Sequence, residues 1–255
     1  MRAAEGAPRP GPPGPFRRAP PARYYAGSVS QAPAPPARDA ADRPGLFLTF
    51  EGGDGVGKTT QTRILAEALR AEGVEVLVTR EPGGTDLGAE IRRLLLDGGH
   101  VDPRAEALLY AADRAHHVAT LVRPALERGA VVVSDRYLDS SVAYQGAARS
   151  LGAEDVRSLS LWATGGLLPD RTILLDADPA LADRRAGGRG GRDRLERESD
   201  AFRAALREQF LALADAEPGR IVVVDAAQPI EAVTAAVRRA LDPLLDARSG
   251  PGGQG

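Results

Sequence analysis

The stretch EGGDGVGKTT at residues 51–60 carries the residues best suited to hold a triphosphate. Gly52, Gly57, Lys58 and Thr59 stand at the G-x-x-x-x-G-K-[ST] spacing. At this spacing the glycines let backbone N–H groups approach phosphate oxygens, the ammonium group reaches the outer phosphates, and the hydroxyl can bind Mg²⁺. The predicted phosphate-binding loop consists of Gly52, Gly53, Asp54, Gly55, Val56, Gly57, Lys58 and Thr59.

The surroundings of this loop support that interpretation over an incidental glycine turn. The apolar run Leu46–Phe50 precedes the loop and predicts a strand, and residues 61–73 follow it with apolar side chains at helical spacing. Lys58 is the single lysine among the 33 basic residues, and all the others are arginine. A lysine ammonium is a compact point charge, which suits a phosphate-binding loop.

Charged residues further along the chain point to phosphoryl transfer. Asp135 and Arg136 end an apolar run, where Asp135 can bind Mg²⁺ directly or through water and Arg136 can bind a second phosphate. Many hydrolytic ATPases would have Glu in place of Arg136. Arg189, Arg192 and Arg194 lie between glycines, a composition that predicts a mobile lid. A positioned arginine accelerates phosphoryl transfer by about 10³ to 10⁵, so these residues favour transfer to a phosphate-bearing acceptor over hydrolysis.

The elements that must position these residues alternate along the chain. Apolar runs too continuous for a half-exposed sheet alternate with amphipathic helical patterns, so we expect an α/β fold with a five-stranded parallel sheet and helices on both faces. The predicted strands are residues 46–50, 74–80, 130–137, 171–178 and 221–226. The predicted helices are residues 61–73, 85–96, 104–128 with a bend near Pro124, 138–161 in one or two pieces, 179–185, 199–216 and 228–245.

Composition excludes several classes of protein. The chain has 255 residues, no cysteine and a net charge of −2, so disulfides and thiolate metal sites are excluded. Residues 1–45 carry seven arginines against three acids, which leaves the remainder at about −6. A polymeric nucleic acid would require a basic face, so we expect no nucleic-acid polymer as a partner. No apolar run approaches the roughly 18 residues of a membrane span, and we expect a soluble cytoplasmic protein with no membrane partner.

The chain divides into three parts by composition. Residues 1–45 hold eleven of the twenty prolines without helical or strand periodicity, so we expect a disordered Pro/Ala/Arg-rich extension, either without function or, less well matched, a transit peptide. Residues 46–246 are expected to form one domain, with an Arg-rich lid at about 186–196. Residues 247–255 are expected to be a flexible tail.

Five segments together resemble the bacterial thymidylate kinases, a family of P-loop nucleoside monophosphate kinases. FEGGDGVGKTTQ, TREPGGT, LLYAADRAHH, SDRYLDSSVAYQG and DRLERE occur in this order across nearly all of residues 46–245. The resemblance implies the P-loop NTPase fold and transfer of a phosphoryl group from ATP to thymidine monophosphate. It further implies Mg²⁺ as a cofactor and a homodimer.

The resemblance also assigns roles in catalysis. Lys58 and its loop match the residues that hold the ATP phosphates. Asp54 matches an acid that contacts the acceptor's sugar and orients the arginine of the Asp-Arg pair, here Arg136. Gly55 stands where some relatives carry an arginine. The lid is therefore implied to supply that arginine, and Arg189 aligns best with it.

For the acceptor, the resemblance assigns residues from all five segments. Tyr110 stands where the family has a Phe stacked on thymine. Ser141, Tyr144 and Gln145 match the stretch that recognises the base and crowds the 2′ position of the sugar. The implied substrate-binding residues are Asp54, Arg80, Tyr110, Arg114, Arg136, Ser141, Tyr144, Gln145 and Glu196.

The residues leave alternatives open. Another P-loop nucleotide or nucleoside kinase would share most of these features, and a regulatory or partition ATPase would share the loop. A GTPase is disfavoured because its N-K-x-D segment needs a second lysine. Arg114 could form a solvated pair with Asp113, and His116 and His117 are expected in packing or at the surface.

Overall fold

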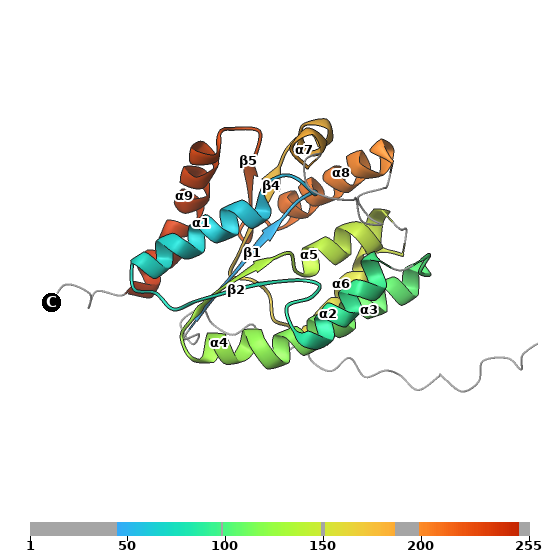
Figure 1. The fold of residues 1–255 in the computed structure, drawn as a ribbon, viewed down its shortest axis with the longest axis horizontal. Helices are drawn as coiled ribbons and strands as arrows, with labels where there is room; N and C mark the ends of the chain where they lie inside the picture. Colours follow the sequence, from blue (N-terminus) through green and yellow to red (C-terminus); the bar gives the residue numbers. More distant parts are fainter. Residues whose placement is uncertain (1–44, 98, 149–150, 187–198, 250–255) are drawn as a thin grey trace, which may run out of the picture. The chain divides into compact units, whose positions relative to one another are not determined.

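The computed structural model describes residues 45–97, 99–148, 151–186 and 199–249, and five strands within them form one parallel sheet in the order β2-β3-β1-β4-β5 (Figure 1). The α/β prediction is confirmed. The strands are β1 (Leu46–Glu51), β2 (Val76–Arg80), β3 (Val131–Asp135), β4 (Arg171–Asp176) and β5 (Ile221–Asp225). The helical elements are α1 (Lys58–Ala71), α2 (Asp86–Leu96), α3 (Pro103–His117), η2 (Val118–Val122), α4 (Arg123–Glu127), α5 (Leu138–Ser141), η3 (Val142–Ala148), α6 (Ala153–Thr164), α7 (Pro179–Ala186), α8 (Asp200–Ala216) and α9 (Ile230–Ser249).

The central strand β1 is buried along its whole length because helices cover both faces of the sheet. Leu48 and Phe50 belong to a core cluster with residues of α1 and α9, which lie on the same side of the sheet in Figure 1. Phe47 belongs to a separate cluster, in which its ring meets the Tyr137 ring edge-on at 4.9 Å between centroids. This two-sided burial explains why the strand is continuously apolar instead of alternating.

Two predicted helices are interrupted. The predicted helix 104–128 consists of α3, the π-helical turn η2 and α4, and the irregular turn lies just before Pro124. Proline has no N–H and its ring crowds the preceding turn, so a wider turn accommodates it. The predicted helix 138–161 is divided into α5, η3 and α6. The final helix α9 reaches Ser249, four residues beyond the predicted end.

The sheet places three loops at one edge. Phe50 pairs with Asp135 between β1 and β3, and Arg80 pairs with Asp135 between β2 and β3. The strands therefore end side by side. The loops that follow β1, β2 and β3 share the carboxyl edge, where open α/β sheets bind ligands. The predicted lid at about 186–196 lies outside the described residues except for residue 186. Residues 1–44 of the predicted extension and residues 250–255 of the predicted tail also lie outside them.

Candidate active site

The loop after β1 has the backbone that a phosphate-binding loop requires. Gly52 has φ of 126°, and a Cβ there would lie 2.3 Å from the carbonyl oxygen of Leu175. Gly57 caps α1 with φ of 103°. Both positions exclude side chains because positive φ is costly for L-residues. Since α1 begins at Lys58, its first unpaired N–H groups face this loop, and the helix dipole favours an anion there.

The ammonium group of Lys58 is held against its own loop. Lys58 Nζ donates to the carbonyl oxygens of Gly52 at 3.0 Å and Gly53 at 2.6 Å, and it lies 4.0 Å from Asp54 Oδ1. Burial lowers the pKa of Lys58, and the nearby carboxylates oppose that shift. A phosphate ligand would therefore add charge compensation to a cation that the loop already orients.

The two predicted magnesium ligands are in contact. Thr59 Oγ1, at the start of α1, donates to Asp135 Oδ2 at the end of β3 over 2.8 Å. A hydroxyl and a carboxylate fit Mg²⁺, which takes few protein ligands and completes its shell with water and substrate phosphates. Within the part of the chain that the structure describes, no cluster of three or more His, Cys, Asp or Glu could form an all-protein metal site.

Arg136 stands in an unusual backbone conformation at the centre of the site. Among the described residues it is the one non-glycine residue with positive φ, at 70°. Its Nη2 donates to Asp54 Oδ1 at 2.5 Å and its Nη1 to the carbonyl oxygen of Gly52 at 3.0 Å. The Asp54–Arg136 ion pair that the resemblance implied is thus present. Burial disfavours the Asp54 carboxylate, but the charges of Arg136 and Lys58 lower its pKa to about 2.

A cavity opens beside Arg136, between the phosphate-binding loop and the layer formed by α2, α3 and η3. It brings together seven of the nine residues predicted for the acceptor. The side chains that line it are Asp54, Glu81, Pro82, Arg92, Leu96, Tyr110, Arg114, Arg136, Tyr137, Ser140, Ser141, Tyr144 and Gln145. Arg80 is exposed at the end of β2 and does not line the cavity, and Glu196 lies outside the described residues.

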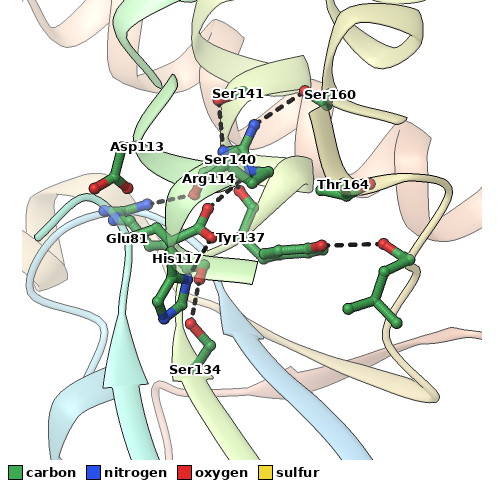
Figure 2. A network of polar contacts seen from close by, with 12 residues as sticks. Glu81, Asp113, Arg114, His117, Ser134, Tyr137, Ser140, Ser141, Ser160 and Thr164 are labelled. Atoms are coloured by element: carbon green, nitrogen blue, oxygen red, sulfur yellow. Dashed lines mark hydrogen bonds and ion pairs between the residues drawn. The ribbon is translucent and has the colours of Figure 1, made fainter. Parts of the chain in front are cut away.

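Arg114 is a buried part of this cavity wall and not a solvated partner of Asp113. Its Nε donates to Glu81 Oε2 at 2.7 Å, and its guanidinium nitrogens donate to Ser160 Oγ and Ser141 Oγ at 3.0 Å each (Figure 2). The guanidinium carbon lies 5.5 Å from the centroid of the Tyr137 ring. These contacts orient the guanidinium before any acceptor binds.

His117 supports Arg114 from the core. Its Nδ1 lies 2.8 Å from Glu81 Oε1, on the carboxylate that also binds Arg114, and its Nε2 lies 2.7 Å from Thr79 Oγ1 (Figure 2 shows the Glu81 contact). A Cβ on Gly84 would lie 2.5 Å from Thr79 Oγ1 and 2.8 Å from the His117 ring. This crowding explains a glycine at that position of TREPGGT, and His117 has a packing role, as expected.

Three predicted residues shape the rest of the acceptor cavity. Tyr144 donates to Asp54 Oδ2 at 3.3 Å, and its ring lies under the Arg136 guanidinium at 5.3 Å. Gln145 is buried and donates to Glu106 Oε1 at 2.9 Å. Tyr110 packs in a small cluster of α2 and α3 side chains while also lining the cavity. The site therefore has an aromatic wall and oriented polar groups.

Arg92 is a cavity residue that the sequence prediction missed. It lies on α2, and its Nη1 donates to the carbonyl oxygen of Pro82 at 3.1 Å. In the sequence Arg92 and Arg93 look like one exposed basic pair, but Arg93 pairs with Glu90 on the helix surface. The helical phase shared with Leu96, four residues on, is the signal that could have separated them.

A second cavity lies on the other side of the phosphate-binding loop, beside the start of α9. Its wall combines small loop residues with apolar side chains, which suits a flat base better than a charged group. It is lined by Gly55, Val56, Gly57, Thr60, Gln61, Ala226, Gln228, Pro229, Ile230 and Val233. The loop thus borders both cavities: Asp54 lines the first, and Gly55, Val56 and Gly57 line the second.

The carboxylate of Asp113 is only partly hydrogen-bonded, which makes the stability of the fold depend on pH. Its Oδ1 accepts from the Gly83 N–H, whereas its Oδ2 is buried without a hydrogen-bond partner within the described residues. Burial and the Glu81 charge raise the pKa of Asp113 from 3.8 to about 6. The ionised carboxylate therefore destabilises the folded state as pH rises through this window, and the full cost is present above about pH 6.

We expect Asp113→Asn to increase the free energy of unfolding by roughly 1 to 3 kcal/mol at pH 8 and by progressively less as pH falls toward 4. Urea unfolding at several pH values measures this change. Asp155→Asn, at an exposed position on α6, is the control and should show no such trend. A gain that is independent of pH would contradict the assignment.

Comparison with known proteins supplies the remaining evidence. The sequence profile of the thymidylate kinase family matches residues 50–237. The thymidylate kinase of Leifsonia xyli subsp. xyli (strain CTCB07) is 63% identical over 203 residues, which cover 79% of this chain and 96% of that protein. That of Cutibacterium acnes (strain DSM 16379 / KPA171202) is 49% identical over 204 residues, covering 79% and 98%. A crystal structure of thymidylate kinase from Ehrlichia chaffeensis superposes with a TM-score of 0.65 at 32% identity, covering 77% of this chain and 98% of that one.

Proposed function

We propose a role for each site residue of this chain, which belongs to the thymidylate kinase family. The chain is a nucleoside monophosphate kinase, a transferase that converts thymidine monophosphate (dTMP) to thymidine diphosphate (dTDP). We propose that ATP is the phosphoryl donor and that Mg²⁺ is required. We also propose a cytoplasmic location, where these nucleotides are found.

The observation that carries this proposal is the pair of cavities flanking one phosphate-binding loop. The cavity beside α9 is proposed for the donor base, and the cavity beside Arg136 for dTMP. In that arrangement the ATP phosphates and the dTMP phosphate meet over Lys58 and Arg136. The pattern suits transfer between two bound nucleotides better than hydrolysis, because an ATPase would have no use for the cavity beside Arg136.

On the donor side, Lys58 and the α1 N-terminus are proposed to hold the ATP phosphates. Thr59 and Asp135 would hold Mg²⁺, which neutralises charge on the phosphates and orients them when bound. Arg136 is proposed to bind the acceptor phosphate and stabilise charge on the transferring group. Arg189, outside the described residues, is proposed to add a second arginine from the lid.

On the acceptor side, the buried Arg114 and the aromatic wall are proposed to select dTMP. Tyr110 would stack on thymine, at the position where the resemblance implies a Phe. Ser141, Tyr144 and Gln145 would contact the base and crowd the 2′ position. Arg80 and Glu196 remain predictions that rest on the resemblance.

A panel of nucleoside monophosphates tests the acceptor. With ATP and Mg²⁺, dTMP is expected to give the fastest ADP release, and uridine monophosphate, cytidine monophosphate and guanosine monophosphate to be much poorer. Preference for one of these would contradict the dTMP assignment. ATP hydrolysis that is unaffected by any monophosphate would instead support the regulatory ATPase, which the comparisons do not favour.

We further propose that two copies of the chain associate through the layer formed by α2, α3 and α6. Figure 1 shows these helices side by side. Of the seven exposed large apolar side chains among the described residues, four lie on this layer: Leu87, Leu94, Leu108 and Trp162. Trp162 is 82% exposed. Several large exposed apolar side chains on one layer of helices are typical of an interface.

We expect Leu108→Glu to convert a dimer to a monomer, because the substitution places a charge on α3, the middle helix of the layer. Light scattering coupled to size exclusion, at micromolar concentrations, measures the mass. Val223→Glu, at an exposed apolar position on β5, is the control and should leave the mass unchanged. A monomeric wild type, or a dimeric Leu108→Glu variant, would argue against this interface.

In the described residues, no helix has both the length and the apolar character needed to cross a bilayer.

A further inference from the structure

The backbone turn at Arg136 raises the question of what holds this residue in place. Positive φ costs a non-glycine residue on the order of 1 to 3 kcal/mol, so surrounding contacts must stabilise it. Two hydrogen bonds hold the backbone of Arg136: its N–H donates to the Phe50 carbonyl at 2.9 Å, and the Ser134 side chain Oγ donates to its carbonyl at 2.8 Å. They hold the N–H and the carbonyl oxygen of Arg136 but leave the Tyr137 N–H and the guanidinium to other groups.

Glu51 supplies those further contacts from beneath the site. It is the last residue of β1 and is only 1% exposed. Its Oε1 accepts from the Tyr137 N–H at 2.7 Å and from the Ser140 N–H at 3.3 Å. One carboxylate oxygen thus binds the backbone immediately after the strained residue and the first turn of α5.

The second carboxylate oxygen reaches the guanidinium through one side chain. Ser140 Oγ donates to Glu51 Oε2 at 2.5 Å and accepts from Arg136 Nη1 at 3.0 Å. The direction of donation is consistent along these two hydrogen bonds: Arg136 donates to Ser140, and Ser140 donates to Glu51. Glu51 does not line either cavity, and the hydrogen bonds that connect it to Arg136 run through this serine and through the backbone.

We propose that Glu51 is a positioning residue for phosphoryl transfer, which sets the backbone turn and the guanidinium direction of Arg136 with Ser140 as the connecting group. The inference rests on the proposed role of Arg136 in binding the acceptor phosphate. A misplacement of about 1 Å in such a group can lower the rate by about a hundredfold. Glu51 therefore acts on the chemical step without touching either substrate.

The electrostatic surroundings of Glu51 make a neutral replacement feasible. Burial raises the pKa of Glu51 to about 7, and Asp139 on α5 adds to the shift, whereas Ser140, Arg136 and the Tyr137 N–H oppose it. Lys58 on α1 is a further charge that acts on it. Since the neutral carboxylic acid is already accessible near neutral pH, glutamine should fit this position without unfolding the protein.

The experiment compares Glu51→Gln and Ser140→Ala in the full chain. Glutamine retains an acceptor for the Tyr137 N–H but offers its amide to Ser140, and alanine deletes the connection altogether. Each variant is expected to lower kcat about tenfold or more, with little change in KM for ATP. Ser140→Thr keeps a hydroxyl and should restore much of the rate that Ser140→Ala loses.

Thr49→Val is the matched control. Thr49 lies two residues before Glu51 on the same strand, is equally buried, and bonds Thr172 Oγ1 at 2.8 Å instead of the Arg136 turn. It should lower stability without lowering kcat. If Glu51→Gln and Ser140→Ala lower the unfolding temperature as Thr49→Val does but leave kcat unchanged, the role is structural and the proposal is wrong.

A double-mutant cycle separates this proposal from the proposed function. If Ser140 acts through Arg136, then Ser140→Ala should have almost no further effect on kcat in an Arg136→Gln background. Additive losses would overturn the positioning role while leaving Arg136 as a catalytic residue. If Arg136→Gln alone left kcat unchanged, the role of Arg136 in the proposed function would fail first.

Discussion

Replacing Lys58 with alanine is expected to lower kcat by at least about 10³-fold. The ammonium group is held within its loop at the start of α1, next to where the outer phosphates of the donor are proposed to bind. At about 4 Å and an effective dielectric near 20, one such charge contributes roughly 4 kcal/mol, which corresponds to about three orders of magnitude.

The fold should survive this change. Burial lowers the pKa of Lys58, so the fold does not depend on this buried charge, and its two hydrogen bonds are made to carbonyls of the same loop. Steady-state kinetics and the unfolding temperature test both statements. Arg63→Ala is the control, because it removes an exposed charge from the same helix. Substantial residual turnover in Lys58→Ala would mean that the loop does not bind the transferred phosphate.

Arg136→Gln is expected to lower kcat/KM for dTMP by about 10² to 10³, since both acceptor binding and charge stabilisation are lost. Lysine should not rescue the activity. The planar Arg136 guanidinium donates to Asp54, Gly52 and Ser140 at the same time, and a lysine ammonium group cannot reproduce that geometry.

The controls for Arg136 use another paired arginine. Arg238→Gln breaks an ion pair between Arg238 on α9 and Glu72 at the end of α1, and it should leave the kinetics unchanged. Asp54 provides a second readout, because loss of Arg136 should raise the pKa of Asp54 from about 2 toward its ordinary value. An Arg136→Gln variant with normal kcat and KM would remove this residue from the proposed mechanism.

Much of the site could be predicted because its signals are local in the chain. The phosphate-binding loop is a contiguous motif, and its function depends on spacing within eight residues. Asp135 and Arg136 were predictable because they end an apolar strand. The five strands were recognisable because a parallel sheet covered on both faces requires continuous apolar runs.

Other features depend on residues that are distant in sequence. Arg114 was predicted from the resemblance to bind the acceptor, but the sequence left a solvated pair with Asp113 open, because its partners Glu81 and Ser160 lie 33 and 46 residues away. Helical phase relative to Leu96 could have separated Arg92 from Arg93, but that Arg92 lines a cavity follows only from the packing of α2 beside α3. Burial and pairing of charges are properties of the assembled layers, and hydropathy along one element does not determine them.

The sequence by itself therefore determined the chemistry: a glycine loop with one ammonium, a carboxylate and an arginine that end a strand, and the order of strands and helices. Only the tertiary structure decided how these groups are oriented. It placed Asp54 against Arg136, buried Glu51 beneath the turn, and separated the two cavities. The physical reason is that hydrogen-bond direction and desolvation arise when distant segments pack together, whereas motif spacing and periodicity already exist in the unfolded chain.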